Sequence, residues 1–156
     1  MPLELRPLDK SNWRPISRLS RTLTWEQSQF VAHNAASMLE AIYDPEHLTV
    51  RGVYLDDEPV GLVMWADIRD QEPKSYYIVR LMVAGPHQRK GYGRAIMEQV
   101  IDRLRDAPEC EKLYISFDPR NDAARKLYES LGFEDTGRLE DDEVVYRLRM
   151  RQGETP

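Results

Sequence analysis

Apolar positions follow two different spacings along the chain, and each change of spacing marks a change of element. Alternation of apolar and polar residues, bounded by turn residues, predicts β-strands. Leu3, Leu5 and Leu8 begin a first short strand. The other predicted strands cover residues 49–55, 60–68, 76–83, 113–117, 133–139 and 143–150, and the last two form a closing hairpin.

Four stretches carry the helical spacing instead. Residues 11–19 predict a short helix that Pro15 limits, and residues 27–42 predict a longer one. Residues 91–106 form a third helix, whose apolar face comprises Ile96, Met97, Val100, Ile101 and Leu104. Residues 121–131 form the fourth, with Asn121 as its N-cap and Gly132 as its C-terminal stop.

This order of elements predicts the fold class. One strand, two helices, three strands, a helix, a strand, a helix and two strands indicate one α/β (α+β) domain with helices packed on a mostly antiparallel sheet. No repeat, linker or low-complexity tract divides residues 1–150, so we expect a single domain, with a frayed tail at 151–156.

Composition narrows the function. Of the 156 residues, 41% are hydrophobic and 31% charged, as in ordinary folded proteins, and the formal net charge of −5 disfavours broad nucleic-acid binding. The one cysteine, Cys110, cannot form an internal disulfide, and the three histidines show no metal spacing. No apolar segment reaches transmembrane length. We therefore expect a soluble, cytoplasmic protein without a metal.

The segment Gln88–Gly93 is the first that suggests chemistry. It lies between a predicted strand and the start of a predicted helix, where unpaired backbone N–H groups and the helix dipole attract anions. Gly91 and Gly93 would let a diphosphate approach the main chain, and three cations surround them. A tight turn with solvated basic residues is the alternative. The segment lacks the third glycine of the dinucleotide fingerprint and the Gly-Lys-Ser/Thr of a P-loop.

A second segment, residues 121–133, also follows a strand and carries a tyrosine within its helix. Together the two segments resemble the GNAT superfamily of N-acetyltransferases, whose signature pairs Gln/Arg-x-x-Gly-x-Gly/Ala with Asn-x-x-Ala-x-x-Leu-Tyr-x-x-x-Gly-Phe. The resemblance covers about residues 50–150. Residues 60–65, the second segment and the ending at 136–139 look most like bacterial spermine/spermidine-type acetyltransferases.

The resemblance implies the fold and the reaction. It implies a mixed, mostly antiparallel sheet of about seven strands, flanked by four helices, with a splay between the fourth and fifth strands. It further implies transfer of an acetyl group from acetyl-CoA to a primary amine of a small molecule, which could be a polyamine, by direct attack in a ternary complex. Two alternatives stay open: acetylation of a protein lysine or N-terminus, and a catalytically silent acyl-CoA-binding module. A homodimer also stays open.

The resemblance assigns site residues as well. Tyr128 would be the general acid. The cofactor-binding residues would be Met82, Val83, Gln88, Arg89, Lys90, Gly91, Tyr92, Gly93, Arg94 and Asn121. The acid role has a chemical reason, since the attack expels a thiolate with a conjugate-acid pKa of ~8.5, and a phenol of pKa ~10 can hydrogen-bond or protonate it. The alternative for Tyr128 is a ring packed in the core.

The chain departs from the family pattern at the general base. Many members hold a glutamate six residues before the valine of the central strand, and here that position is Tyr77. The candidates for a general base in place of this glutamate are Glu26, Asp67 and Glu72. Each of them is alternatively an ordinary charged residue of the surface. Without a dedicated base, activity should keep rising with pH above neutrality. The acidic turn 140–143 could attract a polyamine or simply be solvated.

Overall fold

The computed structural model describes residues 3–150, so the tail expected at 151–156 lies outside the described residues. Within these described residues, seven strands form one sheet in the order β1-β2-β3-β4-β5-β7-β6. All neighbouring pairs are antiparallel except β4 and β5. The strands are β1 (Leu3–Pro7), β2 (Leu48–Leu55), β3 (Glu58–Asp67), β4 (Ser75–Val83), β5 (Lys112–Phe117), β6 (Glu134–Glu140) and β7 (Glu143–Arg149).

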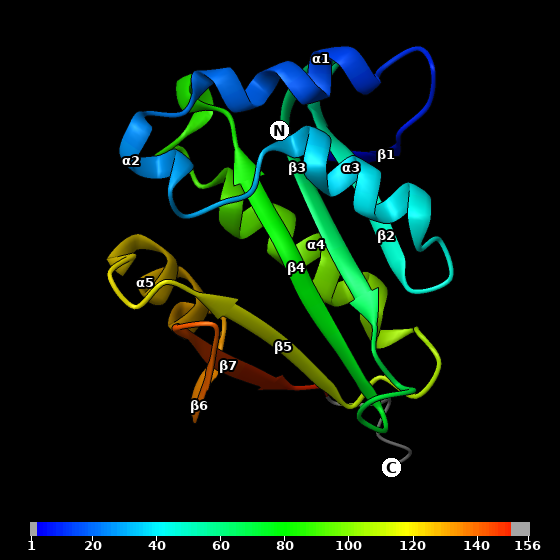
Figure 1. Ribbon diagram of the computed structural model, residues 1–156, viewed down its shortest axis with the longest axis vertical. Helices are drawn as coiled ribbons and strands as arrows, with labels where there is room; N and C mark the ends of the chain where they lie inside the picture. Colours follow the sequence, from blue (N-terminus) through cyan, green and yellow to red (C-terminus); the bar gives the residue numbers. More distant parts are fainter. Residues whose placement is uncertain (1–2, 151–156) are drawn as a thin grey trace.

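Helices cover both faces of this sheet (Figure 1). The larger core lies between the sheet and helices α4 and α5, and a smaller core lies under α1 and α3 on the other face. The helices are α1 (Trp13–Arg18), α2 (Trp25–Ser28), α3 (Asn34–Tyr43), α4 (Tyr92–Arg105) and α5 (Asp122–Ser130), with short 3-10 turns η1 (Leu19–Thr22) and η2 (Gly85–His87). The predicted mixed, mostly antiparallel seven-stranded sheet is confirmed.

The number of helices was wrong, because residues 27–42 do not form one helix. Thr24 and Gln27 make a capping box that starts α2, which ends at Ser28. The His33 side chain accepts a hydrogen bond from the Ala35 N–H and starts α3. The apolar spacing continues across both pieces, so periodicity alone could not reveal the break between them.

The splay predicted between the fourth and fifth strands is also present. β4 and β5 pair only over Ser75–Ile78 and Lys112–Ile115, and the rest of each strand separates. A bulge accompanies the separation, because Met64 pairs with Arg80 and Trp65 with Ile78, which leaves Val79 unpaired. Bulges bend a strand and increase its twist. The bulge therefore helps to direct the second half of β4 away from β5.

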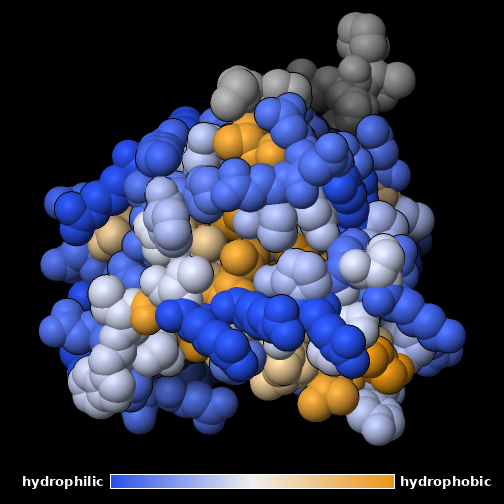
Figure 2. Space-filling view, turned by 90° about the horizontal axis from the view of Figure 1, so that it is seen from above, coloured by the Kyte–Doolittle hydropathy of each residue, from blue (hydrophilic) through white to orange (hydrophobic). Residues whose placement is uncertain are grey.

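The surface is largely polar around this sheet. Seen from the upper end of Figure 1, most of the surface is hydrophilic, and apolar side chains are visible in its centre and at scattered places toward its edges (Figure 2). Within residues 3–150 no helix is both long enough and apolar enough to cross a membrane. Cys110 is buried, and burial raises the pKa of its thiol to about 11.

Candidate active site

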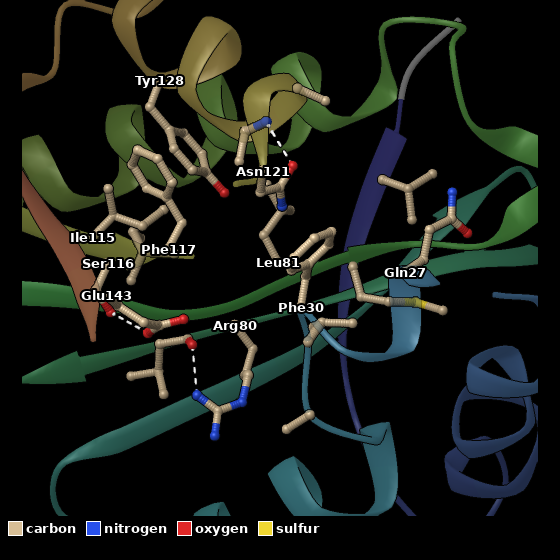
Figure 3. A pocket seen from close by; sticks show the side chains of 18 of the residues that line it. Gln27, Phe30, Arg80, Leu81, Ile115, Ser116, Phe117, Asn121, Tyr128 and Glu143 are labelled. Atoms are coloured by element: carbon tan, nitrogen blue, oxygen red, sulfur yellow. Dashed lines mark hydrogen bonds between the residues drawn. The ribbon is translucent and has the colours of Figure 1, made fainter. Parts of the chain in front are cut away.

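The separation of β4 from β5 opens a cleft of about 590 Å³. Its walls come from β4, β5 and the start of α5, and the segment between α2 and α3 closes one side (Figure 3). Ile78 and Ile115, the last paired residues of the two strands, lie at its apex. Gln88, beyond the end of β4, lies at its other end. The two ends therefore offer different chemistry.

A chain of side-chain hydrogen bonds orders the Gln88 end. The Gln88 amide donates to the Val83 carbonyl oxygen at 2.9 Å, and the Gln27 amide donates to Gln88 Oε1 at 2.7 Å. Met82 and Val83 both line the cleft. The Val83 carbonyl already has a donor in this arrangement.

The loop between Gln88 and α4 holds two left-handed residues, Arg89 (φ 62°) and Gly91 (φ 83°). Left-handed residues within a turn make concavities of backbone N–H groups that bind anions. The first hydrogen bond of α4 joins the Ala95 N–H to the Gly91 carbonyl at 3.1 Å, and the first turn contains no acidic residue. A Cβ at Gly91 would meet nothing within 4 Å, so the space above this residue is open.

Gly93 has a different surrounding. A Cβ on Gly93 would lie 3.5 Å from Leu127 Cδ2 of α5, an ordinary van der Waals contact, so Gly93 faces α5. The Arg94 guanidinium contacts Glu98 (2.9 Å) and the Ser130 hydroxyl (2.6 Å).

Within residues 3–150, the other two cations of the segment have no such contacts. Among the described residues, Arg89 and Lys90 form no ion pair. The Tyr92 ring lies 6.1 Å from the His87 ring.

Four of the ten predicted cofactor-binding residues line the cleft, and the other six form the adjoining loop and first turn of α4. Those in the cleft are Met82, Val83, Gln88 and Asn121. The Asn121 side-chain oxygen accepts a hydrogen bond from the Ala124 N–H at 3.2 Å. Asn121 is therefore the N-cap of α5, as the sequence predicted.

Tyr128 projects from α5 into the cleft with its hydroxyl pointing inward (Figure 3). Its ring is only 7% exposed and lies 5.5 Å from the Phe117 ring and 5.9 Å from the Phe133 ring. Within residues 3–150 its hydroxyl has no hydrogen-bond partner. Burial, and to a smaller extent the negative charge of Glu143, raise the pKa of this phenol. Tyr128 thus carries its proton at neutral pH, with its ring packed in the core and its hydroxyl in the cleft.

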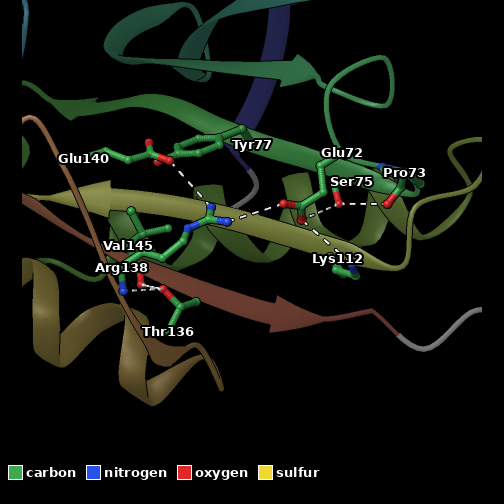
Figure 4. A network of polar contacts seen from close by, with 9 residues as sticks. All are labelled: Glu72, Pro73, Ser75, Tyr77, Lys112, Thr136, Arg138, Glu140 and Val145. Carbon is green, nitrogen blue, oxygen red and sulfur yellow. Dashed lines mark hydrogen bonds and ion pairs between the residues drawn. The ribbon is translucent and has the colours of Figure 1, made fainter.

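None of the three carboxylates considered as a base lines the cleft. Hydrogen bonds from Arg69 lower the pKa of Asp67, and their closest approach is 2.7 Å. Glu72 lies in a polar network with Ser75, Lys112 and Arg138 (Figure 4). Hydrogen bonds from Tyr114, Ser75 and Arg138 lower its pKa. Glu26 lies on α2.

Tyr77, at the position of the family's glutamate, does not replace that residue as a base, because its side chain is turned away from the cleft. Its ring stacks on Tyr114 at 6.2 Å, and its hydroxyl donates to Glu140 Oε2 at 3.1 Å. Burial raises the pKa of Tyr77 to about 12. The phenol therefore stays protonated and cannot accept a proton.

Two charged residues in the cleft were not predicted as site residues. Glu143 begins β7 and accepts a hydrogen bond from the Ser116 hydroxyl at 3.0 Å. Arg80 donates to the Val79 carbonyl at 2.8 Å and lies 3.3 Å from Glu40 of α3. The sequence suggested Glu143 only as part of the acidic turn 140–143. The position of Glu143 in the cleft depends on the pairing of β7 with β5.

Known proteins share the sequence pattern and the fold. Residues 11–133 match the Acetyltransferase (GNAT) family. The spermine/spermidine N(1)-acetyltransferase of Bacillus subtilis (strain 168) is 26% identical over 93 residues, which are 57% of this chain and 61% of that protein. The chain thus spans about three fifths of the length of this curated relative.

Solved structures are similar over almost the whole chain. The spermidine N-acetyltransferase from Vibrio cholerae, in complex with CoA and spermine, has a TM-score of 0.74 at 22% identity, covering 95% of both chains. An aminoglycoside acetyltransferase in complex with coenzyme A and kanamycin has a TM-score of 0.79 at 20% identity, covering 97% of this chain and 96% of that one. At these identities the likeness establishes the fold.

Proposed function

The chain belongs to the GNAT family of acetyltransferases, and on this premise we propose that it transfers an acetyl group from acetyl-CoA to a primary amine of a small molecule. One observation carries the proposal. A single cleft joins a loop suited to a diphosphate, at residues 88–93, to a buried phenol whose hydroxyl lacks a partner in the described chain.

The residues around the Gln88 end fit the cosubstrate. The open space at Gly91 and the free N–H groups of the first turn of α4 suit the pyrophosphate, and Arg89 and Lys90 add charge. Met82 and Val83 would flank the pantetheine arm as an added strand. The arm would reach along the cleft toward Tyr128, where the bound thioester supplies an activated acetyl group.

Tyr128 completes the reaction by acting on the leaving sulfur. A neutral amine attacks the thioester carbonyl, a C–N bond forms, and the C–S bond breaks. The Tyr128 hydroxyl donates a hydrogen bond or its proton to the sulfur as negative charge develops there. The proton lost from the new amide nitrogen restores the phenol, so the products are the acetamide and a free thiol.

A polyamine is the finer proposal for the acceptor. The curated relative and the Vibrio structure are named for spermine or spermidine, and a net charge of −5 attracts cations. The similar aminoglycoside acetyltransferase was solved with kanamycin, which also carries several amino groups. Cytoplasmic location, a homodimer, and the absence of nucleic-acid and membrane partners stay predictions.

The test is turnover with an amine panel, read as free thiol released from acetyl-CoA. The panel contains spermine, spermidine, a monoamine, an aminoglycoside and a lysine-containing peptide. We expect the highest kcat/KM with a small polyamine. Turnover with the peptide alone would establish the protein acetyltransferase instead. Acetyl-CoA binding without turnover on any amine would favour the silent binding module.

A further inference from the structure

Two of the described residues that line the cleft are charged, and within residues 3–150 only one of them lacks an opposite charge. Arg80 lies 3.3 Å from Glu40 of α3, which partly neutralises its guanidinium. Glu143 has no ion pair within the described part of the chain; its hydrogen bond comes from the neutral Ser116 hydroxyl. Removing a carboxylate from water is unfavourable unless a cation accompanies it. The half-buried Glu143 is therefore suited to a cation that arrives in the cleft.

Strand pairing and one side-chain hydrogen bond together position this carboxylate. Val145 pairs with Ser116 and Val144 with Phe117, so Glu143 follows directly beyond the end of β5. Ser116 comes immediately after Ile115, the last residue of β5 that pairs with β4. The Ser116 hydroxyl holds the carboxylate in place, as Figure 3 shows. Glu143 thus lies away from the Gln88 end, where the phosphates would bind.

Glu143 is also within electrostatic reach of Tyr128. Its negative charge adds to the effect of burial in raising the pKa of the phenol. A cation or a proton at Glu143 would remove this effect and make Tyr128 a stronger acid. Binding of a cation at Glu143 would therefore favour the later donation of a proton by Tyr128.

We propose that Glu143 binds the ammonium group of the acceptor amine and takes up its proton before the attack. This inference rests on the proposed acetyl transfer. The N–H bond of the ammonium breaks, its proton moves to a Glu143 oxygen directly or through one water, and the neutral amine keeps the lone pair. Glu143 later releases that proton to solvent. The balance is one ammonium and one thioester giving one acetamide, one thiol and one released proton.

The principal test replaces the carboxylate with a neutral group of the same shape. Glu143→Gln should lower kcat/KM for the best alkylamine by about 10²- to 10⁴-fold, the range for loss of an acid–base group. Acetyl-CoA affinity, measured by calorimetry, should stay within about twofold. Glu143→Asp should recover part of the activity, since it restores the charge one methylene further back.

The hairpin itself offers a matched control. Glu140 pairs with Glu143 across the β6–β7 turn, but it accepts its hydrogen bond from Tyr77 and does not line the cleft. Glu140→Gln removes the same charge from the same hairpin. Its kinetics should match those of the unmodified protein.

Two readouts separate proton uptake from a structural effect. An arylamine is neutral at pH 7, so Glu143→Gln should affect it far less than an alkylamine. For an alkylamine, kcat/KM of the unmodified protein should level off near neutral pH, whereas that of Glu143→Gln should keep rising with pH. Equal losses on both amines, or a rising profile for the unmodified protein, would overturn the proposal.

Failure of this inference differs from failure of the proposed function. If the unmodified protein turns over an amine and Glu143→Gln turns it over equally well, Glu143 has no such role while acetyl transfer stands. If the unmodified protein releases no thiol with any amine of the panel, the acetyltransferase proposal fails, and the assignment of Glu143 fails with it.

Discussion

At the scale of single residues, solvent exclusion determines what Tyr128 can do. Its ring is enclosed by Phe117 and Phe133, while its hydroxyl reaches the cleft. Burial disfavours the phenolate, so the group keeps its proton. The protonated hydroxyl can therefore donate a hydrogen bond to the departing thiolate as negative charge develops on the sulfur.

Tyr128→Phe should separate chemistry from binding, because it removes the hydroxyl and retains the ring. We expect kcat to fall by about ten- to a thousandfold. This loss is smaller than the full general-acid range, because a thiolate is a fairly good leaving group without protonation. The Kd for acetyl-CoA should hardly change. Steady-state kinetics and calorimetry on the same samples provide the check. Unchanged kcat on a good substrate would make Tyr128 a core residue only.

At the scale of elements, the start of α4 depends on a backbone conformation that favours glycine. Gly91 has φ 83° directly before the first helical residue, and Arg89 has φ 62° two residues earlier. Left-handed residues within a turn form concavities of backbone N–H groups. The hypothesis of an anion site therefore rests on the shape of the loop as well as on its charge.

Gly91→Ala should weaken acetyl-CoA binding by at least about tenfold, because a methyl group would enter the open space and a left-handed alanine costs about 1–2 kcal/mol. Gly137→Ala is the matched control. Gly137 also has a left-handed φ, of 80°, and open space around its Cβ position, but it lies in β6. Both variants should lose similar stability, and only Gly91→Ala should lose affinity. Equal affinities would place the diphosphate elsewhere.

The connection from α3 to β2 carries a pH-sensitive contact. His47 Nδ1 lies 2.8 Å from Asp44, and His47 Nε2 lies 3.0 Å from Asp70. The hydrogen bond with Asp44, and then the charges of Asp44 and Asp70, raise the pKa of His47. A raised pKa stabilises the fold fully below the ordinary value near ~6.5 and loses that effect as pH rises through the folded-state value.

His47→Gln should therefore lower the Tm more at pH 5.5 than at pH 9. The measurement is thermal unfolding of both proteins across this range in the same buffer system. The contact is exposed, so the difference at pH 5.5 should be small and should shrink in high salt. A Tm difference that does not vary with pH would contradict the assignment.

At the scale of the whole molecule, the sheet is continuous at one end of the β4–β5 pair and open at the other. β4 is held by β3 along its length, while β5 is held by β7, so the two halves of the sheet meet only at Ser75–Ile78 and Lys112–Ile115. A ligand between the halves would bridge them. Binding should therefore stabilise the molecule as a unit.

Acetyl-CoA at about 100 times its Kd should add about 2.7 kcal/mol to the free energy of unfolding, because it binds the native state alone. For a domain of this size this corresponds to a rise of about 5–10 °C in Tm. Thermal melts with and without the compound test this, and adenosine alone is the control. An unchanged Tm together with no heat of binding would contradict the enzyme assignment.

The sequence by itself determined features that depend on neighbours within one turn or one strand. The period of α4, the capping of α5 by Asn121 and its end at Gly132, and the alternating strands are all local, and the structure has them within a few residues. Each of the two GNAT segments is contiguous as well, so the family resemblance could be recognised from residues 88–93 and 121–133 alone. The regular apolar spacing of residues 27–42 gave a wrong prediction of one helix, because the spacing continues across the break between α2 and α3.

Only the tertiary structure decided which charges share the cleft. Glu72, from the loop before β4, is directed toward Lys112 and Arg138, while Glu143, more than sixty residues after β4 begins, lies in the cleft. β7 reaches this place because it pairs with β5 on the side away from β4. Side-chain position in a sheet is set by pairing partner and register, which are long-range quantities. Neither is encoded in the residues adjacent to Glu143.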